Sequence, residues 1–139
     1  MNPLQSLPDY EHFVYTLPQR HASIRYSDLT VVRRGASIAR LSGTVELTGG
    51  YRLVVREKLS FDEGPGTIAG YGYEVWQGEQ LLYWYDSQPH PNEPALAETH
   101  PHHKHVPPDI KHHRVPAPGL SSSEPNLPFL LGEIERLLT

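Results

Sequence analysis

Residues 38–61 read IARLSGTVELTGGYRLVVREKLSF, and they decide the fold class of the chain. Apolar and polar residues alternate on both sides of Thr48-Gly49-Gly50, which is the pattern of β-strands with one buried face. Glycine adopts positive φ angles at low cost, so the Gly-Gly pair is typical of a tight hairpin turn. We therefore predict two antiparallel strands, over residues 38–47 and 51–61.

Short connections extend this hairpin into a larger sheet. A first strand is expected over residues 22–33, a fourth over 67–76 and a fifth over 79–86, the last two joined at Gln77-Gly78. Connections of hairpin length leave no room for parallel crossovers. The sequence thus predicts an α+β fold whose centre is a five-stranded antiparallel meander sheet at about residues 22–86.

Helices are expected near both ends of the chain. A short one is expected over residues 10–17, ended by Pro18. A second, amphipathic helix is expected over residues 126–138, with Asn126 as its N-cap and an apolar stripe at helical spacing. The polar residues of this helix are expected to face water, and they are Glu133, Glu135 and Arg136.

Length and composition narrow the class of protein. The chain has 139 residues, and we expect a single domain over residues 1–139. It contains no cysteine, which excludes disulfides, thiolate metal sites and a cysteine nucleophile. It also lacks a signal peptide or an apolar run of membrane-spanning length, so we expect a cytoplasmic protein that does not bind membranes. The net charge of −4 argues against non-specific nucleic-acid binding but permits a local basic cleft.

Proline and histidine gather in one segment, residues 87–125 and its borders. Ten of the 14 prolines lie between Pro89 and Pro128, and seven of the nine histidines lie between His90 and His113. Proline fixes φ and removes a backbone donor, so we expect neither sheet nor helix over residues 87–125. Because the following helix must pack on the sheet, both ends of the segment are held. We therefore predict a long, ordered, functional loop.

The strongest chemical signal in this loop is THPHHKH at residues 99–105. Imidazoles exchange protons near neutral pH and bind transition metals, and the ammonium group of Lys104 favours an anion. A solvated histidine-rich loop without chemistry is the plain alternative. A metal would need three or four converging ligands, and the candidates are Asp86, His90, His103 and His105.

The predicted sheet adds further candidates. Asp86 lies at the end of the last predicted strand, directly after three aromatic residues. Strand ends often present functional groups, but an aspartate there can instead cap a turn. Glu57 shares a face with apolar residues, which is costly unless the carboxylate is paired, by function or by a neighbouring arginine. Tyr71 and Tyr73 alternate with glycines; their rings can stack on bases or belong to the core.

Together these residues resemble the TumE family of toxin–antitoxin proteins. The similarity covers about residues 41–105, and its motifs are Glu57, Tyr71-X-Tyr73, Tyr85-Asp86-X-X-Pro89-His90 and Pro101-His102-His103-Lys104-His105. The resemblance implies a small bacterial toxin that a co-encoded helix-turn-helix antitoxin neutralises. Ser87-Gln88, the loop over residues 92–99 and the proline-rich extension through Gly119 depart from the family pattern.

By analogy between folds, the resemblance also implies a small ribonuclease, and our lead hypothesis is RNA cleavage without a metal cofactor. Cleavage through the ribose 2′-hydroxyl needs a base, an acid and a cation beside the phosphate. Glu57 or His103 is the candidate base, and His105 or His102 the candidate acid. The remaining candidates are Lys104 for the phosphate, Asp86 to orient a histidine, His90 as a further catalytic group, and Tyr71, Tyr73, Tyr85 and Arg56 for substrate binding.

Other functions stay open at this point. The same region could form a metal-dependent phosphodiesterase or nuclease with Asp86, His90, His103 and His105 as ligands of a divalent ion. It could also be a non-catalytic module whose histidine-rich loop holds a protein or a nucleic acid. Homodimerisation through a free sheet edge is a further possibility. The catalytic hypothesis requires that the imidazoles fold back over the last strand, so that Glu57, Asp86 and the histidines share one pocket.

Overall fold

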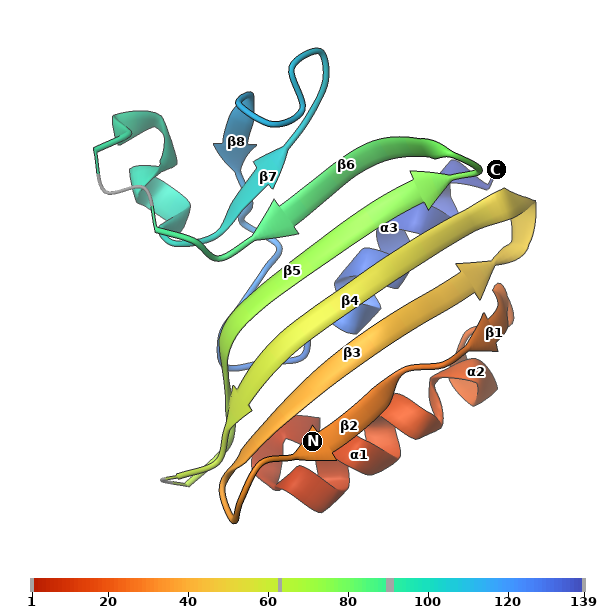
Figure 1. Ribbon diagram of the computed structural model, residues 1–139, viewed down its shortest axis with the longest axis vertical. Helices are drawn as coiled ribbons and strands as arrows, with labels where there is room; N and C mark the ends of the chain where they lie inside the picture. The colour runs from red at the N-terminus through yellow and green to blue at the C-terminus, as the bar shows by residue number, and fades with distance from the viewer. Residues whose placement is uncertain (1, 63, 90–91, 139) are drawn as a thin grey trace.

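The computed structural model describes residues 2–62, 64–89 and 92–138, and it has the predicted α+β class (Figure 1). Its helical elements are η1 (Pro3–Gln5), α1 (Leu7–Tyr15), α2 (Leu17–Arg20), η2 (Thr48–Gly50), η3 (Pro94–Thr99) and α3 (Leu127–Leu137). Its strands are β1 (Ile24–Ser27), β2 (Thr30–Arg33), β3 (Ile38–Leu47), β4 (Tyr51–Ser60), β5 (Thr67–Gln77), β6 (Gln80–Asp86), β7 (His103–His105) and β8 (Arg114–Pro116).

One antiparallel sheet contains all eight strands that the described residues form. Its order is β1-β3-β4-β5-β6-β7-β8, with β2 paired to β3 beside β1. The predicted central hairpin is present, and its register places Val45 opposite Leu53 and Leu41 opposite Glu57. Gly49 and Gly50 have φ angles of 77° and 78°, as the glycine turn requires.

The single first strand predicted over residues 22–33 is wrong, because the chain divides there into β1 and β2. The Asp28 carboxylate accepts a hydrogen bond from the Thr44 N–H at 2.6 Å, in place of a neighbouring strand. At Gly43 a Cβ atom would lie 2.6 Å from Asp28 Oδ1 and 2.9 Å from the backbone oxygen of Asp28, so only glycine fits this close approach. The strand is therefore interrupted at Asp28, whose side chain replaces a backbone hydrogen-bond acceptor of the sheet.

The absence of sheet predicted for residues 87–125 is also wrong. Strands β7 and β8 form a hairpin that pairs with β6, and with the division of the first strand they bring the sheet from five predicted strands to eight. The three residues of β7 include no proline, so they can complete a backbone ladder. Pro116 lies in β8, the edge strand, where proline is tolerated. The imidazole-rich segment therefore does fold back against the last predicted strand.

The helix predicted over residues 10–17 begins earlier and ends earlier. Helix α1 starts after Ser6, whose Oγ accepts a hydrogen bond from the Asp9 N–H at 3.2 Å. Pro18 does not end this helix but lies in the first turn of α2, where its missing N–H leaves no helical bond unmade. No helix among the described residues is both long and apolar enough to cross a membrane.

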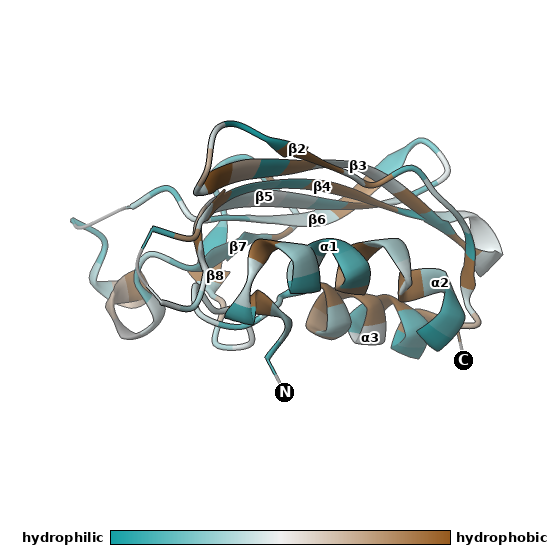
Figure 2. Cartoon of the chain, turned by 90° about the horizontal axis from the view of Figure 1, so that it is seen from below, coloured by the Kyte–Doolittle hydropathy of each residue, from teal (hydrophilic) through white to brown (hydrophobic). Residues whose placement is uncertain are grey.

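The three α-helices cover one face of the sheet, here called the inner face, and leave the outer face uncovered (Figure 2). The predicted apolar stripe of α3 packs on the inner face, and Leu137 at its end is 46 % exposed. The core residues contributed by β4 and α3 are 0 % exposed, and they include Leu53, Val55, Leu59, Leu130, Leu131 and Ile134. Function must therefore be sought on the outer face or at the sheet edges.

Candidate functional site

Pairing between β6 and β7 brings a carboxylate and two imidazoles together. Asp86 lies opposite His103, and Trp84 lies opposite His105. Alternate residues of a strand point to the same face, so these four side chains share the outer face. Asp86, His103 and His105 are called the Asp86 cluster below.

The polar atoms of the Asp86 cluster converge on one point. His103 Nε2 lies 2.8 Å from Asp86 Oδ1, and His105 Nε2 lies 3.5 Å from Asp86 Oδ2. The two Nε2 atoms are 3.1 Å apart. Three groups that accept a proton or a metal therefore face one another across a single small gap.

The opposite ring nitrogens of both histidines are held by the backbone. His103 Nδ1 lies 3.2 Å from the Pro101 carbonyl oxygen, and His105 Nδ1 lies 3.0 Å from the carbonyl oxygens of Ile110 and Lys111. A carbonyl oxygen can only accept, so the Nδ1–H of either ring donates to the backbone. His105 then presents the lone pair of its Nε2 atom to the Asp86 cluster, whereas His103 donates a hydrogen bond to Asp86.

Burial shapes the charge of this site. The side chains of His103 and His105 are 1 % and 3 % exposed, whereas that of Asp86 is 16 % exposed. Burial lowers the pKa of His105; the Asp86 carboxylate opposes this shift and the charge of His103 adds to it. Burial raises the pKa of Asp86, but hydrogen bonds from His103 and the Gln88 N–H outweigh it, and the net pKa is lowered. Near neutrality the site therefore offers an ionised carboxylate beside an imidazole that resists protonation.

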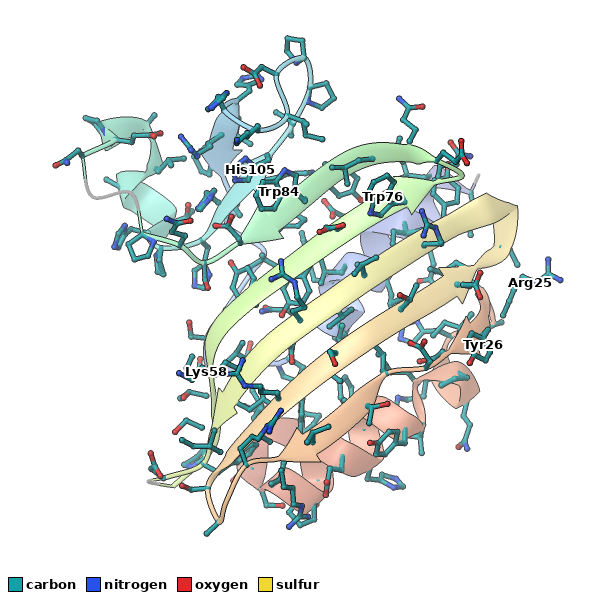
Figure 3. The ribbon with its side chains drawn as sticks, in the orientation of Figure 1. Arg25, Tyr26, Lys58, Trp76, Trp84 and His105 are labelled. Carbon is teal, nitrogen blue, oxygen red and sulfur yellow. The ribbon has the colours of Figure 1, made fainter. Side chains whose placement is uncertain are left out.

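Trp84 forms one wall of the site. Its indole ring stacks on the His105 imidazole with a centroid distance of 3.8 Å and an interplanar angle of 13°, and Figure 3 shows the two rings side by side. The indole Nε1–H donates to the carbonyl oxygen of Ile110 at 3.3 Å. Trp84 and the chain after β7 thus clamp His105 in one orientation.

A basic hollow lies on the outer face beside the Asp86 cluster. It has a volume of about 380 Å³, and its lining includes Arg34, Arg40, Arg56, Lys58, Gly70 and Gly72. In the sheet register, Arg56, Gly72, Asp86 and His103 follow one another across four strands. The hollow therefore leads to the Asp86 cluster along one row of the sheet.

Two glycines of β5 keep this row open. A Cβ atom on Gly72 would lie 2.4 Å from a guanidinium nitrogen of Arg56, so the missing side chain lets Arg56 lie across β5. A Cβ atom on Gly70 would meet only Ser87 Oγ, at 3.7 Å. Arg56, a predicted substrate-binding residue, is thus exposed and directed along the row that contains Asp86.

Glu57 does not share a pocket with the Asp86 cluster, and that expectation is wrong. Its strand position places it on the inner face, where it is 4 % exposed. The hydroxyls of Tyr10 and Tyr73 donate to its two carboxylate oxygens, and Asn126 Nδ2 donates to the Tyr73 hydroxyl at 3.1 Å. Burial raises the pKa of Glu57 although both tyrosine hydrogen bonds oppose this shift. Glu57 also borders the basic hollow, but its carboxylate is paired inside the core.

The tyrosines predicted to bind substrate lie on the inner face as well. Tyr73 and Tyr85 are 0 % and 2 % exposed, so their rings belong to the core and cannot stack on a base. Tyr71 is 8 % exposed, and its hydroxyl lies 2.7 Å from His102 Nδ1. His102 stacks on the Tyr71 ring, with the two planes 3° apart, and its contacts differ from those of the Asp86 cluster. Burial, with the charges of His100 and His103, lowers the pKa of His102.

Lys104 also points away from the Asp86 cluster. It stands between His103 and His105 in β7, so strand alternation turns it to the inner face. Its Nζ donates to Glu133 at 3.3 Å and lies 4.1 Å from the centre of the Tyr83 ring. Glu133, expected to face water, also accepts from the Tyr85 hydroxyl at 2.9 Å. This group ties β7 to α3 and does not reach a phosphate on the outer face.

Asn126 differs from its prediction too, because its side chain makes no capping bond although it occupies the N-cap position of α3. His90, a predicted catalytic group and metal ligand, lies outside the described residues.

Sequence reasoning also missed Trp84 as a wall of the site, and it missed Arg34, Arg40 and Lys58 as the basic residues that lead to it. Strand alternation had placed Arg56 and Lys58 on one face, but only the register shows that Arg40 joins them.

Comparison with protein families identifies the chain. The family model described as "Toxin TumE" matches residues 13–138. The chain belongs to the TumE toxin family. A TumE toxin is one half of a toxin–antitoxin system, so this protein has an antitoxin as its partner. The matched region contains every strand of the sheet and the Asp86 cluster. Searches of curated proteins and of solved structures gave no match.

Proposed function

We propose that this TumE toxin cleaves RNA at the Asp86 cluster while the RNA lies on the outer face of the sheet. The observation that carries the proposal is the row that joins the exposed guanidinium of Arg56 to Asp86 and His103. Cations that bind phosphates and groups that transfer protons are the two requirements of phosphodiester cleavage. Both occur here on the outer face, where the partly exposed Asp86 gives access to the buried His103 and His105.

The basic hollow supports binding of the ribose-phosphate backbone. Arg34, Arg40, Arg56 and Lys58 are all exposed and line the same depression, within a chain whose net charge is −4. The positive charge is thus local, as in a cleft that attracts a polyanion to one place. The bare surface at Gly70 and Gly72 gives a backbone room to approach the sheet.

The spacing within the Asp86 cluster limits the chemistry. A base and an acid that act together must stand on opposite sides of the phosphorus, each about 2.6–3.2 Å from its own oxygen. His103 Nε2 and His105 Nε2 are only 3.1 Å apart, so they act on the phosphodiester from one side as a single centre. In a metal-independent reaction this centre takes the proton of the 2′-hydroxyl, O2′ forms the bond to phosphorus, and the bond to O5′ breaks. The proton required by O5′ then comes from water, and Arg56 offsets the developing phosphate charge.

Inactivating substitutions test the proposal. Asp86→Asn, His103→Gln and His105→Gln are expected to relieve growth arrest and to lower cleavage of labelled RNA by at least about 10²-fold each. His112→Ala is the matched control, because His112 is an exposed histidine of the same segment and pairs with Asp109. If the three variants remain as toxic as the parent at equal protein level, the assignment is wrong. An RNA that shifts in mobility yet stays intact would favour the non-catalytic binding module.

Binding along the basic hollow has a separate signature. Each phosphate contact removed from a single-stranded RNA complex lowers the slope of log affinity against log salt by about 0.7. Arg56→Gln and Lys58→Gln are each expected to lower the slope by that amount, and Arg25→Gln, which lies outside the hollow, is the control. An unchanged slope in both hollow variants would contradict RNA binding on this surface.

We also propose that the antitoxin is a helix-turn-helix protein and that it neutralises the toxin by covering the outer face. Co-expression is then expected to abolish the arrest, and bound antitoxin to protect Trp84 from collisional quenching. A quenching rate of Trp84 that is the same with and without antitoxin would contradict coverage of the outer face.

Homodimerisation would use the free edge at β8, and sedimentation of the toxin alone tests it.

A further inference from the structure

We propose that Asp86, His103 and His105 form a binding site for one divalent transition-metal ion of the zinc class. The proposal deepens the proposed function, because it gives the same cluster a resident cation. It stands on the geometry of the three side chains and does not require that RNA be the substrate.

The first support is electrostatic. The Nε2 atoms of His103 and His105 are 3.1 Å apart and a carboxylate oxygen lies 2.8 Å from that of His103, so positive charge between the three groups stabilises the arrangement. In the present structure His103 donates a hydrogen bond to Asp86. A metal cation would replace that hydrogen and bind all three groups at once, while the backbone carbonyls of Pro101, Ile110 and Lys111 accept from Nδ1 of each ring.

The second support is the shell around the ligands. Metal-binding histidines commonly donate their other N–H to a backbone carbonyl or a carboxylate, which fixes the tautomer and the ring orientation. Both His103 and His105 do so, and Trp84 stacks on His105 to hold the second ring in place. The ligands are thus oriented before any ion arrives, which lowers the entropy cost of binding.

The third support is the fit of donor set and distance. One ligand atom from each of the three residues can be chosen so that all lie within 4.8 Å of one another. Two ligands about 2.0–2.2 Å from a tetrahedral zinc ion are roughly 3.3–3.6 Å apart, so shifts of a few tenths of an ångström complete the site. Two histidines and one carboxylate leave further positions open for water or substrate, as in catalytic zinc sites. The partial exposure of Asp86 places that opening toward the outer face.

Titration of the purified, untagged, full-length chain with zinc sulfate, after removal of metals by chelator, tests the site. We expect one zinc ion per chain by calorimetry, with a rise in Tm, and at least 10²-fold weaker binding in His103→Gln and His105→Gln. Asparagine has nearly the same shape as aspartate, so Asp86→Asn is expected to fold like the parent. It is expected to weaken zinc binding at least 10-fold. His112→Ala is expected to bind zinc as the parent does.

A second readout follows the metal at the site itself. Trp76→Phe leaves Trp84 as the single tryptophan, and a paramagnetic ion bound beside His105 quenches the fluorescence of an indole in contact with that ring. Cobalt(II) chloride is expected to quench this emission to saturation at one equivalent, and His105→Gln to abolish the saturable part. Quenching that rises linearly with cobalt, or zinc binding that is equal in the parent and all three cluster variants, would overturn the metal site.

Failure of this inference is distinguishable from failure of the proposed function. If the parent binds no zinc, cobalt or manganese at one equivalent but still cleaves RNA after chelator treatment, the metal site is wrong and the cleavage proposal stands. If the metal binds and RNA remains intact with it, the site stands and the ribonuclease proposal falls.

Discussion

Asp86 and His103 face each other across β6 and β7, with a carboxylate oxygen and an imidazole nitrogen 2.8 Å apart. This contact joins the end of the regular meander to a short strand that sequence periodicity does not reveal. It also decides the face on which the proposed chemistry lies. With His103 on the outer face, His105 follows it there and Lys104 must turn toward α3.

Substitution of Glu57 separates a structural from a catalytic role. Glu57→Ala leaves the buried hydroxyls of Tyr10 and Tyr73 without their acceptor, so we expect the free energy of unfolding to fall by about 3–5 kcal/mol. Glu57→Gln keeps an acceptor in place and is expected to remain toxic and to cleave RNA. Urea unfolding and the growth assay measure the two effects. Loss of RNA cleavage in a stably folded Glu57→Gln protein would contradict a purely structural role of Glu57.

The buried carboxyl group also predicts how stability depends on pH. The folded pKa of Glu57 is raised above its ordinary value of 4.5, chiefly by burial. Between the unfolded and the folded pKa, the folded chain binds more protons than the unfolded chain, so stability falls as pH rises through this window. The advantage of the parent over Glu57→Gln is therefore expected to shrink from pH 4 upward. Unfolding free energies measured at several pH values test this, and a constant or growing advantage contradicts it.

Gly72→Ala is expected to weaken RNA binding without unfolding the protein. Its Cβ atom would meet the mobile end of the Arg56 side chain at 2.4 Å, so the guanidinium must leave the row to Asp86. Because only a flexible group moves, we expect the free energy of unfolding to change by less than about 1 kcal/mol. Gly132→Ala is the control, since its Cβ atom would meet nothing within 4 Å and it lies in α3, outside the hollow. Equal RNA affinity in both variants would show that Arg56 does not bind the backbone from its present position.

Lys104→Ala is expected to act on stability and to spare the chemistry. The ammonium group donates to Glu133 on α3 and lies over the Tyr83 ring, and both contacts are partly buried. Their loss is expected to lower the free energy of unfolding by about 1–2 kcal/mol. Zinc affinity and RNA cleavage at a temperature where the variant is folded are the measurements. If Lys104→Ala lost as much RNA cleavage as His103→Gln, Lys104 would have to act in the reaction and the prediction would be wrong.

The central hairpin, the class of the fold and the packing stripe of α3 were predictable from local pattern. Alternation over residues 38–61 and helical spacing over residues 126–138 are repeated signals within short windows, and they depend on burial of one face alone. The chemical identity of the site was predictable in part, because Asp86 and the imidazole run are unusual residue types close together in the sequence. The TumE family follows from the same motifs.

The composition of the site was decided by tertiary structure. A shift of one residue in strand pairing moves every side chain to the other face, and the ladder from β4 to β6 contains two irregularities that change this parity. Local alternation therefore cannot show that Glu57 and Asp86 lie on opposite faces. The pairing of residues 103–105 with β6 joins segments separated by a proline-rich loop, and its register depends on long-range contacts. For that reason the sequence alone named the imidazoles, while the folded chain selected His103 and His105 for the site.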